Sequence, residues 1–496
     1  MGSICSREPT TYTSTPKLKS QNYLITKEEE LAFSPGIFVR ENGACFNSVY
    51  DVDDKSLGSG RNGEVKKCKH IATNDVRVVK IIRKADLPQK MIETRAVFKE
   101  VEILKTVDHP NMPRIYEFFE DEINFYIVLE LCTGGDLFDK ILEFNIFTES
   151  QAAEIMFQIL SGLTYLHSKS IVHRDIKPEN ILLSNKNTLS LKIIDYDTAT
   201  FFGSGFHREM FGTPLYMAPE IVKGRYTEKC DLWSCGMIML ILLIGRPPYD
   251  GTDEEILQIL KNVNIDIENL CPGVSEEAKS LLKSLLEADP DKRISAKEAC
   301  LHPWIKSYTQ SVSQKDISKV LLRMKSFKRT SKLREAIHTF IISKIMDPNI
   351  YSKEQKVFNF LDVNRDGTIS SKELAELLKK ELPAEEVDLF TDTIMQHVDS
   401  DKSGQIDYTE FLKATINYKK VCTKENLLRA FKFFDEDGNG TIEYSELSSA
   451  LTDGAMITQE LIQELMSQVD TNQDGKIDLD EFESLLFDAL NVKKGS

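Results

Sequence analysis

The hydrophobic residues of this chain follow two different patterns along its length. In the first 300 residues, short apolar runs at residues 76–82 and 125–129 predict buried strands, and residues 94–106 predict a helix. Residues 237–244 are apolar throughout, which predicts a hydrophobic helix. Strands and helices are therefore mixed in this part of the chain.

After residue 310, apolar residues recur at mostly helical spacing and alternate with basic ones. The apolar positions are Ile317, Val320, Leu321, Met324, Phe327, Leu333, Ile337, Phe340 and Ile341. Residues 315–334 carry eight Lys or Arg against one Asp, a local charge of 8 − 1 = +7. Calmodulin targets and interfacial membrane helices have this composition, and an uncommitted surface helix is a third interpretation. We expect a basic junction helix at residues 310–350, and the acidic segment after it favours an intramolecular target.

The last third of the chain contains a fourfold repeat. Residues 362–373, 399–410, 435–446 and 470–481 fit the calcium-binding loop of an EF hand, and their starts are 37, 36 and 35 residues apart. Each loop has glycine at position 6, where the chain must turn sharply, and isoleucine at position 8, where paired loops form a short sheet. We therefore expect a domain of two EF-hand pairs at residues 351–490, with every loop binding Ca²⁺.

Calcium takes six to eight oxygen ligands, which an EF-hand loop supplies from positions 1, 3, 5, 7 and 12. The residues expected at these positions are Asp362, Asn364, Asp366, Thr368 and Glu373 in the first loop, Asp399, Asp401, Ser403, Gln405 and Glu410 in the second, Asp435, Asp437, Asn439, Thr441 and Glu446 in the third, and Asp470, Asn472, Asp474, Lys476 and Glu481 in the fourth.

Length and charge limit the possible functions. A chain of 496 residues exceeds what one hydrophobic core normally supports, so we expect at least two domains. The net charge of −16 argues against a nucleic-acid partner, because such proteins need a basic surface. The nine cysteines form no CxxC pair, which indicates free thiols in a reducing compartment. The longest apolar run has eight residues and is too short to span a bilayer, and we find no secretory signal.

The clearest catalytic motif is the sequence H-R-D-I-K-P-E-N at residues 173–180, which is the catalytic loop of protein kinases. Phosphoryl transfer needs a carboxylate to accept the hydrogen bond of the attacking hydroxyl and an amide oxygen to hold metal behind the phosphates. Asp175 and Asn180 are placed for these roles, and Lys177 would neutralise charge on the moving phosphoryl group. An accidental polar loop is a poor alternative, because the other kinase motifs occur in order on both sides.

A glycine-rich segment precedes this loop and predicts a phosphate-binding turn between two strands. It reads G-x-G-x-x-G-x-V, and its expected nucleotide contacts are Leu57, Gly58, Gly60, Gly63 and Val65. The same glycine spacing occurs in dinucleotide sites, but no helix pattern opens at Gly63. Lys80 on the following strand is expected to bind the α- and β-phosphates, and Glu100 is preferred over Glu102 as its ion-pair partner.

Further residues are assigned from their order along the chain. We expect Glu130 and Cys132 in the hinge that reads adenine, and Asp136 beside a ribose hydroxyl or a basic substrate residue. Asp195 is the expected Mg²⁺ ligand of the motif that usually reads Asp-Phe-Gly, but here Tyr196 and Asp197 follow it. Because aspartate reaches the backbone angles of glycine only at a cost, we predict restricted swinging of this segment rather than lost catalysis.

The activation loop is expected at residues 201–211, before the Gly-Thr-Pro and Ala-Pro-Glu sequences. Glu209 stands where many kinases carry a phosphorylated threonine, so its carboxylate is a candidate partner for Arg174. A solvated loop residue is the alternative. We also expect Glu220 and Arg293 to form a pair that braces the large lobe.

The first 50 residues are expected to form a partly disordered leader. They begin Met-Gly-Ser-Ile-Cys-Ser, which fits the pattern for myristoylation at Gly2, and Cys5 is a candidate for palmitoylation. Two lipids would hold the protein at the cytoplasmic face of a membrane. An unmodified polar terminus is an equally good interpretation.

Taken together, these motifs resemble the calcium-dependent protein kinases of plants and apicomplexan parasites over nearly the whole chain. The resemblance implies a multidomain protein, with an α+β bilobal kinase fold followed by an all-α calmodulin-like domain. It also implies a monomeric Ser/Thr kinase that uses ATP, Mg²⁺ and Ca²⁺ and is autoinhibited at low Ca²⁺. Glu179 and Asp136 suggest protein substrates with basic residues before the acceptor.

Two other functions fit parts of the sequence. Asp197 is compatible with a Ca²⁺-responsive scaffold that no longer transfers phosphate, although Lys80, Glu100, Asp175 and Asp195 are present. A constitutive kinase whose EF hands only buffer Ca²⁺ is disfavoured by the basic helix between the domains.

Overall fold

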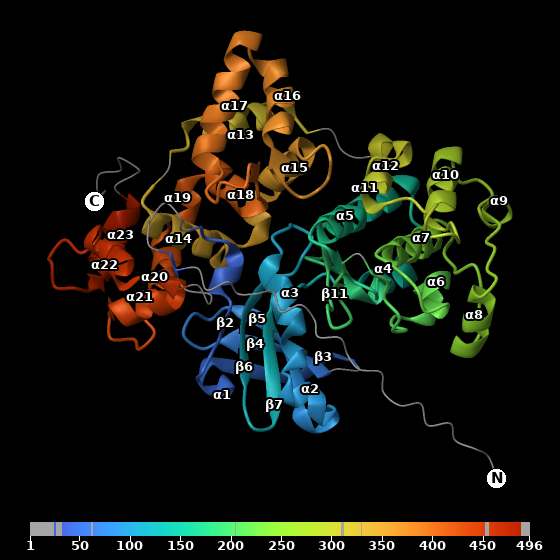
Figure 1. The fold of residues 1–496 in the computed structure, drawn as a ribbon, viewed down its shortest axis with the longest axis horizontal. Coiled ribbons are helices and arrows are strands. Elements are labelled where there is room, and N and C mark those ends of the chain that lie inside the picture. Colours follow the sequence, from blue (N-terminus) through green and yellow to red (C-terminus); the bar gives the residue numbers. More distant parts are fainter. Residues whose placement is uncertain are drawn as a thin grey trace. The chain divides into compact units, whose positions relative to one another are not determined.

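The computed structural model describes residues 24–25, 32–60, 63–203, 205–308, 312–328, 330–451 and 456–487 (Figure 1). The chain divides into two compact units. The larger unit is Phe33–Ala430, and the smaller combines Met1–Ala32 with Phe431–Ser496. The larger unit thus contains the whole α+β domain, the junction and the first EF-hand pair.

A six-stranded sheet forms the first lobe of the larger unit, with the strand order β2-β6-β7-β5-β4-β3. All neighbouring strands are antiparallel except β2 and β6. The strands are β2 (Arg40–Glu41), β3 (Tyr50–Gly60), β4 (Gly63–His70), β5 (Val76–Arg83), β6 (Ile115–Glu120) and β7 (Asn124–Leu129). The two apolar runs at residues 76–82 and 125–129 are thus β5 and β7, which pair directly.

The helix predicted over residues 94–106 is shorter than expected. The structure has α2 (Gln89–Glu93), a 3-10 turn at Ala96–Phe98 and then α3 (Lys99–Thr106). Arg95 adopts a left-handed backbone conformation with φ of 51°, which interrupts the helical path. The hydrophobic positions after residue 98 lie on α3, where Val101, Ile103 and Leu104 are buried.

The predicted leader ends earlier than residue 50, because residues 33–50 pack onto the sheet lobe. A 3-10 turn (Pro35–Phe38) contacts α3, β2 pairs with β6, and α1 (Phe46–Val49) leads into β3. The ring of Phe46 stacks on that of Tyr126 with centroids 4.3 Å apart. These aromatic contacts explain why this stretch folds with the sheet although it carries no strand-like alternation.

The second lobe is mostly helical and is built around two buried helices, α5 (Glu149–Ser168) and α7 (Lys229–Ile244). Helix α7 is buried along almost its whole length, as its continuous apolar run predicts. The other elements are α4 (Leu137–Phe144), β8 (Ile171–Val172), β9 (Ile181–Leu183), β10 (Leu191–Ile193), β11 (Thr200–Phe201), α6 (Pro219–Val222), α8 (Asp253–Leu260), α9 (Ile267–Leu270), α10 (Glu276–Leu285), α11 (Ala296–Cys300) and α12 (Pro303–Tyr308).

The basic junction contains two helices instead of one. Helix α13 (Gln314–Ser326) ends at Phe327, whose backbone is extended, and α14 (Lys332–Phe340) continues into a π-helical turn at Ile341–Ile345. The apolar face of α13, formed by Ile317, Val320, Leu321 and Met324, is buried. Across the described ranges, no helix combines the length and apolarity needed to cross a membrane.

The first EF-hand pair consists of two helix–loop–helix units that face each other. The helices are α15 (Ser352–Leu361), α16 (Ser371–Glu381), α17 (Ala384–Val398) and α18 (Tyr408–Thr415). Strands β12 (Ile369–Ser370) and β13 (Gln405–Ile406) join the loops, and Ile369 pairs with Ile406. Helix α13 packs against α15, α17 and α18. After this pair come α19 (Tyr418–Val421) and α20 (Lys424–Phe434).

The second EF-hand pair belongs mainly to the smaller unit. It contains α21 (Tyr444–Leu451), α22 (Gln459–Ser467) and α23 (Leu479–Phe487), and its loops pair through β14 (Thr441–Ile442) and β16 (Ile477–Asp478). Ile442 faces Ile477, so the prediction that position 8 joins the loops is confirmed in both pairs. Within the same unit, β1 (Leu24–Ile25) pairs in parallel with β15 (Met456–Ile457).

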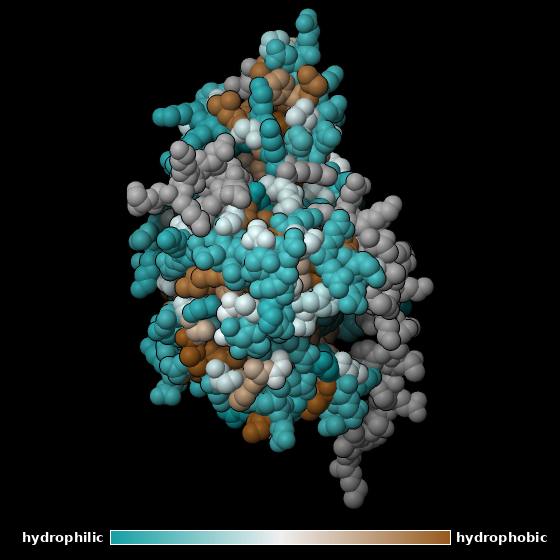
Figure 2. All heavy atoms as spheres, turned by 90° about the vertical axis from the view of Figure 1, so that its left-hand side faces the viewer, coloured by the Kyte–Doolittle hydropathy of each residue, from teal (hydrophilic) through white to brown (hydrophobic). Residues whose placement is uncertain are grey.

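Hydrophilic side chains cover most of the face drawn in Figure 2, and hydrophobic residues on it occur in small separate groups. This surface agrees with a composition in which 28% of the residues are charged.

Candidate active site and calcium sites

The catalytic loop follows β8 and is held in place by one buried carboxylate at the start of α7. Asp231 accepts hydrogen bonds from the backbone nitrogens of His173 and Arg174 at 3.0 and 2.9 Å, and its side chain also contacts His167 at 2.9 Å. Although burial opposes ionisation, these hydrogen bonds lower the pKa of Asp231 below its ordinary value. Arg174 is thereby fixed in a left-handed conformation with φ of 71°.

Four side chains converge on the expected position of the acceptor hydroxyl. Lys177 Nζ lies 2.9 Å from Asp175 Oδ2, and Asn180 Nδ2 donates to the same oxygen at 3.2 Å. The hydroxyl of Thr213 donates to Asp175 Oδ1 at 3.1 Å and accepts from Lys177 Nζ at 2.9 Å. The amide oxygen of Asn180 takes no part in these bonds, so it can serve a metal ion.

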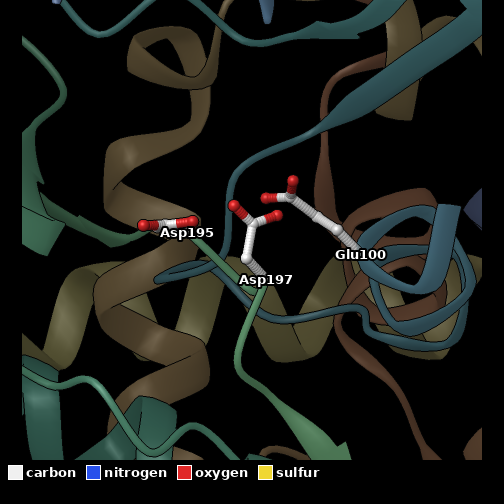
Figure 3. A group of neighbouring side chains, drawn as sticks. All are labelled: Glu100, Asp195 and Asp197. Carbon is white, nitrogen blue, oxygen red and sulfur yellow. The ribbon is translucent and has the colours of Figure 1, made fainter. Parts of the chain in front are cut away.

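The carboxylates of Glu100, Asp195 and Asp197 gather on the other side of the site (Figure 3). Lys80 lies among them. Its Nζ is 2.9 Å from Glu100, 3.4 Å from Asp195 and 2.7 Å from Asp197. Burial disfavours a charged lysine, but the carboxylates outweigh it and raise the pKa of Lys80. Lys80 therefore stays protonated and able to bind phosphate. Glu102 lies on the exposed side of α3.

In the Asp-Tyr-Asp sequence, the residue with the positive φ is the first aspartate and not the one that replaces glycine. Asp195 has a positive φ of 66°, whereas Asp197 is not among the positive-φ residues of the described chain. The aspartate in place of glycine therefore causes no backbone strain in this conformation. The predicted restriction concerns other conformations of the segment and stays a prediction. Tyr196 is fully buried, and its hydroxyl donates to the Ile193 carbonyl at 3.2 Å.

The glycine-rich turn lies between β3 and β4 as predicted. Leu57, Gly58 and Gly60 lie on β3, and Gly63 and Val65 lie on β4. Gly58 pairs with Val65, and Gly60 pairs with Gly63. Gly63 has φ of 138°, and a Cβ there would lie 2.4 Å from the Ile81 carbonyl oxygen. Only glycine fits this position.

The EF-hand loops repeat one pattern of hydrogen bonds. The position-1 aspartate accepts from the position-6 glycine nitrogen at 2.9, 2.9, 3.0 and 2.8 Å in the four loops. The position-12 glutamate accepts from backbone nitrogens near the loop start at 2.9, 2.7, 2.8 and 2.9 Å. The loops thus direct their carboxylates inward, as a Ca²⁺ site requires.

Among the described residues, the second and third loops bring three carboxylates together. Asp399, Asp401 and Glu410 form one group and Asp435, Asp437 and Glu446 another, each with ligand atoms within 4.8 Å of one another. In the third loop, the buried Oδ1 of Asp435 has no hydrogen-bond partner. In the second, burial and then the neighbouring Asp407 raise the pKa of Glu410 to about 8. A divalent cation would relieve both conditions.

The first and fourth loops have asparagine at position 3, and their carboxylates form no such group within the described ranges. The oxygen donors that the sequence predicts are nevertheless present in every loop, so all four fit Ca²⁺.

Comparison with known proteins supports both halves of this description. The protein kinase domain family matches residues 52–305, and the EF-hand domain pair family matches residues 352–416 and 424–486. "Calcium-dependent protein kinase 4" of Plasmodium falciparum (isolate 3D7) is 37% identical over 481 residues, covering 92% of this chain and 90% of the relative. "Calcium-dependent protein kinase 3" of Plasmodium berghei (strain Anka) is 37% identical over 473 residues, covering 92% and 83%.

The chain belongs to the calcium-dependent protein kinases. It is a serine/threonine protein kinase that Ca²⁺ activates, and it uses ATP and Mg²⁺. In this calcium-dependent protein kinase, Asn180 and Asp195 would hold Mg²⁺, which supplies positive charge to the phosphates. Asp175 is placed to receive the hydrogen bond of the acceptor hydroxyl, and Lys177, 2.9 Å from it, to balance charge beside it.

The predicted hinge of this calcium-dependent protein kinase contains Glu130 and Cys132, whose side chains are not free polar groups. The carboxylate of Glu130 is engaged elsewhere, by the Arg114 backbone nitrogen at 3.1 Å and Lys192 at 3.2 Å. Burial raises the pKa of the Cys132 thiol to about 12, so this thiol stays protonated at neutral pH. Asp136 caps α4 by accepting from the Asp139 nitrogen at 2.8 Å, so only part of its carboxylate remains for ribose or substrate.

The activation segment of the kinase is tied to the catalytic loop. Arg174 lies 3.7 Å from Glu209, as predicted, and also stacks on the Phe211 ring at 4.5 Å. The predicted pair Glu220 and Arg293 is bidentate, with distances of 2.5 and 2.9 Å. Sequence reasoning missed Thr213 as a functional residue. The available signal was its place in the Gly-Thr-Pro sequence that ends the activation segment.

The N-terminal sites Gly2 and Cys5 lie outside the described residues.

Proposed function

We propose that Ca²⁺ controls the kinase through direct contacts between the loops of the first EF-hand pair and the kinase domain, and that loss of these contacts at low Ca²⁺ leaves the enzyme autoinhibited. The observation that carries this proposal is the pairing of Asp108 with Thr409. Asp108 accepts from the Thr409 backbone nitrogen at 2.9 Å and from its hydroxyl at 3.1 Å. Thr409 is position 11 of the second loop and directly precedes the ligand Glu410.

The first loop also contacts the kinase domain. Gly367, at position 6, lies so close to Tyr165 of α5 that a Cβ would be 2.4 Å from its ring. The guanidinium of Arg365 lies over the Phe157 ring at 4.8 Å. A change in loop shape on metal binding would therefore alter these contacts directly, without a separate relay.

The end of the junction and the residue after it contact the segment that pairs with the hinge. Arg114 donates to the Met346 carbonyl at 2.6 Å and to the Tyr351 hydroxyl, while its backbone nitrogen bonds to the hinge residue Glu130. Lys344 is buried, and its Nζ donates to the Ile115 carbonyl at 2.6 Å. Through Arg114, these contacts connect the junction to the hinge, so the docked form would hold the hinge in place for nucleotide binding.

Helix α13 fits the role of an intramolecular target for the calmodulin-like domain. Its buried apolar face contacts the helices of the first EF-hand pair, and Arg323 donates to Glu354 at 3.0 Å and to the Thr415 carbonyl at 2.5 Å. This combination of apolar face and basic rim is the one calmodulin targets use.

A radiolabelled ATP assay with a protein substrate, run in chelator and in saturating Ca²⁺, tests the proposal. We expect transfer only in Ca²⁺. Thr409→Val should raise the Ca²⁺ concentration for half-activation, because it removes a hydrogen bond of the docked form. Thr393→Val is the matched control, since the Thr393 hydroxyl bonds only within its own helix, to the Leu389 carbonyl. Equal rates in chelator and Ca²⁺, or equal half-activation in both variants, would contradict the proposal.

We further propose that the kinase prefers protein substrates with basic residues before the acceptor. Glu179 is an exposed residue of the catalytic loop, and Asp136 lies at the start of α4, so both offer carboxylates near the acceptor site. A peptide-library profile without Arg or Lys enrichment would disprove this preference.

The sequence pattern at Gly2 and Cys5 supports a proposed lipid anchor at the cytoplasmic face of a membrane, with the protein as a monomer. Intact-mass measurement of protein from the native cell should show the added acyl chains, and sedimentation should give the mass of one chain.

A further inference from the structure

Asp197 makes the shortest contact that Lys80 has with any carboxylate. Its distance of 2.7 Å compares with 2.9 Å to Glu100 and 3.4 Å to Asp195. In Figure 3 the Asp197 carboxylate lies between those of Asp195 and Glu100. Asp197, which replaces the usual glycine, therefore forms an ion pair with the lysine that nucleotide phosphates are expected to bind.

The third carboxylate changes the charge of this site. With every group ionised, one ammonium against three carboxylates gives a formal charge of 1 − 3 = −2, whereas glycine at position 197 would give 1 − 2 = −1. Three of these four groups are shielded from water: the Lys80 side chain is 11% exposed, that of Glu100 3% and that of Asp197 16%, whereas that of Asp195 is 38% exposed. Charges in such surroundings interact more strongly than exposed ones.

Nucleotide phosphates are themselves anionic, so they must share Lys80 with Asp197 and enter a more negative site. We propose that Asp197 is a positioning residue that makes nucleotide binding depend on divalent cations: it competes with the phosphates for Lys80 when no cation is present. When a cation is bound, the same carboxylate faces positive charge, and the competition disappears. The inference rests on the assignment of this site as a kinase nucleotide site, which the family membership supports.

The size of the effect follows from known charge pairs. An opposite charge within about 4–6 Å shifts an ionic equilibrium by about one to three pKa units, which is about tenfold or more. Because phosphates can approach Lys80 from the open side, we expect the lower end, about tenfold. The cost should appear in the affinity without Mg²⁺ and vanish at saturating Mg²⁺.

The test is equilibrium binding of a fluorescent ADP to the full chain, without Mg²⁺ and with saturating Mg²⁺. Free Ca²⁺ is buffered at about 10 µM in both arms, at the upper end for Ca²⁺ sensors, so that the EF hands stay in the same state. The variants are Asp197→Asn, which removes the charge, and Asp197→Gly, which restores the usual residue. Asp291→Asn, an exposed carboxylate of the large lobe, is the matched control.

We expect both Asp197 variants to bind ADP without Mg²⁺ about tenfold more tightly than the unaltered chain, with affinities at saturating Mg²⁺ unchanged within about threefold. Asp291→Asn should match the unaltered chain in both arms. An affinity without Mg²⁺ that is unchanged or weaker in both Asp197 variants would overturn the inference, as would an equal gain with and without Mg²⁺. If the chain bound no nucleotide in either arm, the kinase assignment itself would fail, and this outcome is distinct from both.

Discussion

At the scale of single residues, catalysis depends on side chains that orient Asp175. Thr213 is the clearest case, because its hydroxyl connects Asp175 and Lys177 from the end of the activation segment. Its location means that Asp175 is fully oriented only when that segment is folded. Thr213 thereby couples the folding of the activation segment to the orientation of Asp175.

Thr213→Ala should lower kcat by about ten- to hundredfold, because it leaves two charged partners without a hydrogen bond worth about 1–3 kcal/mol. Thr213→Ser keeps the hydroxyl and should stay close to the unaltered rate. Steady-state kinetics with a fixed peptide substrate measures both. An alanine variant with full kcat would show that Asp175 is oriented without this residue.

Glu209→Gln should lower activity by less than about fivefold. The Glu209 side chain is 55% exposed and 3.7 Å from Arg174, and such exposed pairs contribute about 0–1 kcal/mol. The unaltered kinase should be active without phosphate on its activation loop, which mass spectrometry of the assayed protein can verify. A loss above tenfold would mean that Glu209 does more than form this pair.

The residue roles that the sequence predicted are those that a local motif defines. Asp175, Lys177, Asn180 and Asp195 occur in short runs whose order is enough to place them. Thr213 and the Lys80–Asp197 pair were missed because each depends on residues that meet only after folding. In the Asp-Tyr-Asp sequence, Asp195 and not Asp197 has the positive φ, which no local pattern in the sequence indicates.

At the scale of elements, the helices of the junction are held to the first EF-hand pair by buried charge. Glu335 of α14 lies 3.1 Å from Lys413 of α18 and 3.0 Å from Lys332. Burial opposes ionisation of Glu335, but the two lysines, Lys413 first, lower its pKa to about 2. Helix α14 is therefore fixed to α18 by an ion pair that contributes only while Glu335 is ionised.

Glu335→Gln should destabilise the chain by about 3–5 kcal/mol at neutral pH, because it leaves Lys413 buried without its partner. The folded pKa of Glu335 lies below its ordinary value of 4.5, so its contribution is present above pH 4.5 and is lost as the pH falls toward 2. Glu335→Gln should not show this loss of stability at low pH, because glutamine does not ionise. Urea unfolding above and below pH 4.5 measures it, with Glu376→Gln, an exposed pair on α16, as control. Parallel pH profiles for all three proteins would contradict the assignment.

Residues 33–50 act as an element of the kinase although they precede the matched domain. The turn at Pro35–Phe38 contacts the end of α3, the helix that carries Glu100, and Phe38 packs edge-on against Phe340 of α14 at 5.3 Å. The strap formed by residues 33–41 thus lies between the catalytic helix and the junction.

Gly36→Val should loosen this strap, because its Cβ would lie 2.1 Å from the Lys105 carbonyl oxygen. We expect a cost of about 1–3 kcal/mol, a lower melting temperature and reduced Ca²⁺-stimulated activity. Gly43→Val is the matched control, since no atom lies within 4 Å of a Cβ there. Limited proteolysis should cut the strap faster in the Gly36 variant only. Equal behaviour of the two variants would show that α3 does not depend on the strap.

Sequence periodicity predicted the elements better than their connections. It identified β5, β7 and α7, but it extended one helix back to residue 94 and joined two helices of the junction. The breaks at Arg95 and Phe327 come from single backbone conformations, which hydrophobic spacing does not report. The strap was missed because aromatic packing holds it, not a repeating pattern.

At the scale of the whole molecule, the order of kinase, junction and four EF hands was predictable because each part has its own motif. The docking of the first EF-hand pair on the kinase domain was not, because it joins residues as distant as Asp108 and Thr409. No short stretch of sequence records such a pairing.

Activation by Ca²⁺ should be cooperative. Moving an equilibrium from 1:99 to 99:1 takes about 5.5 kcal/mol, and one site present only in the active state supplies about 1.4 kcal/mol at ten times its dissociation constant. Four sites would suffice, and one would not. A Ca²⁺ titration of peptide phosphorylation should give a Hill coefficient well above one, and a value near one would exclude joint action of the loops.

The bond between Asp108 and Thr409 has a consequence for how such proteins diversify. Its two partners are encoded far apart, so a gene fusion that exchanged the C-terminal third between two relatives would bring together a loop and a surface that had not been selected together. In a duplicated gene, a change at this contact in the kinase domain therefore needs a matching change in the EF-hand loop, and the reverse is also true. The kinase domain and the EF-hand domain are separate families of domain, but this contact favours their inheritance together.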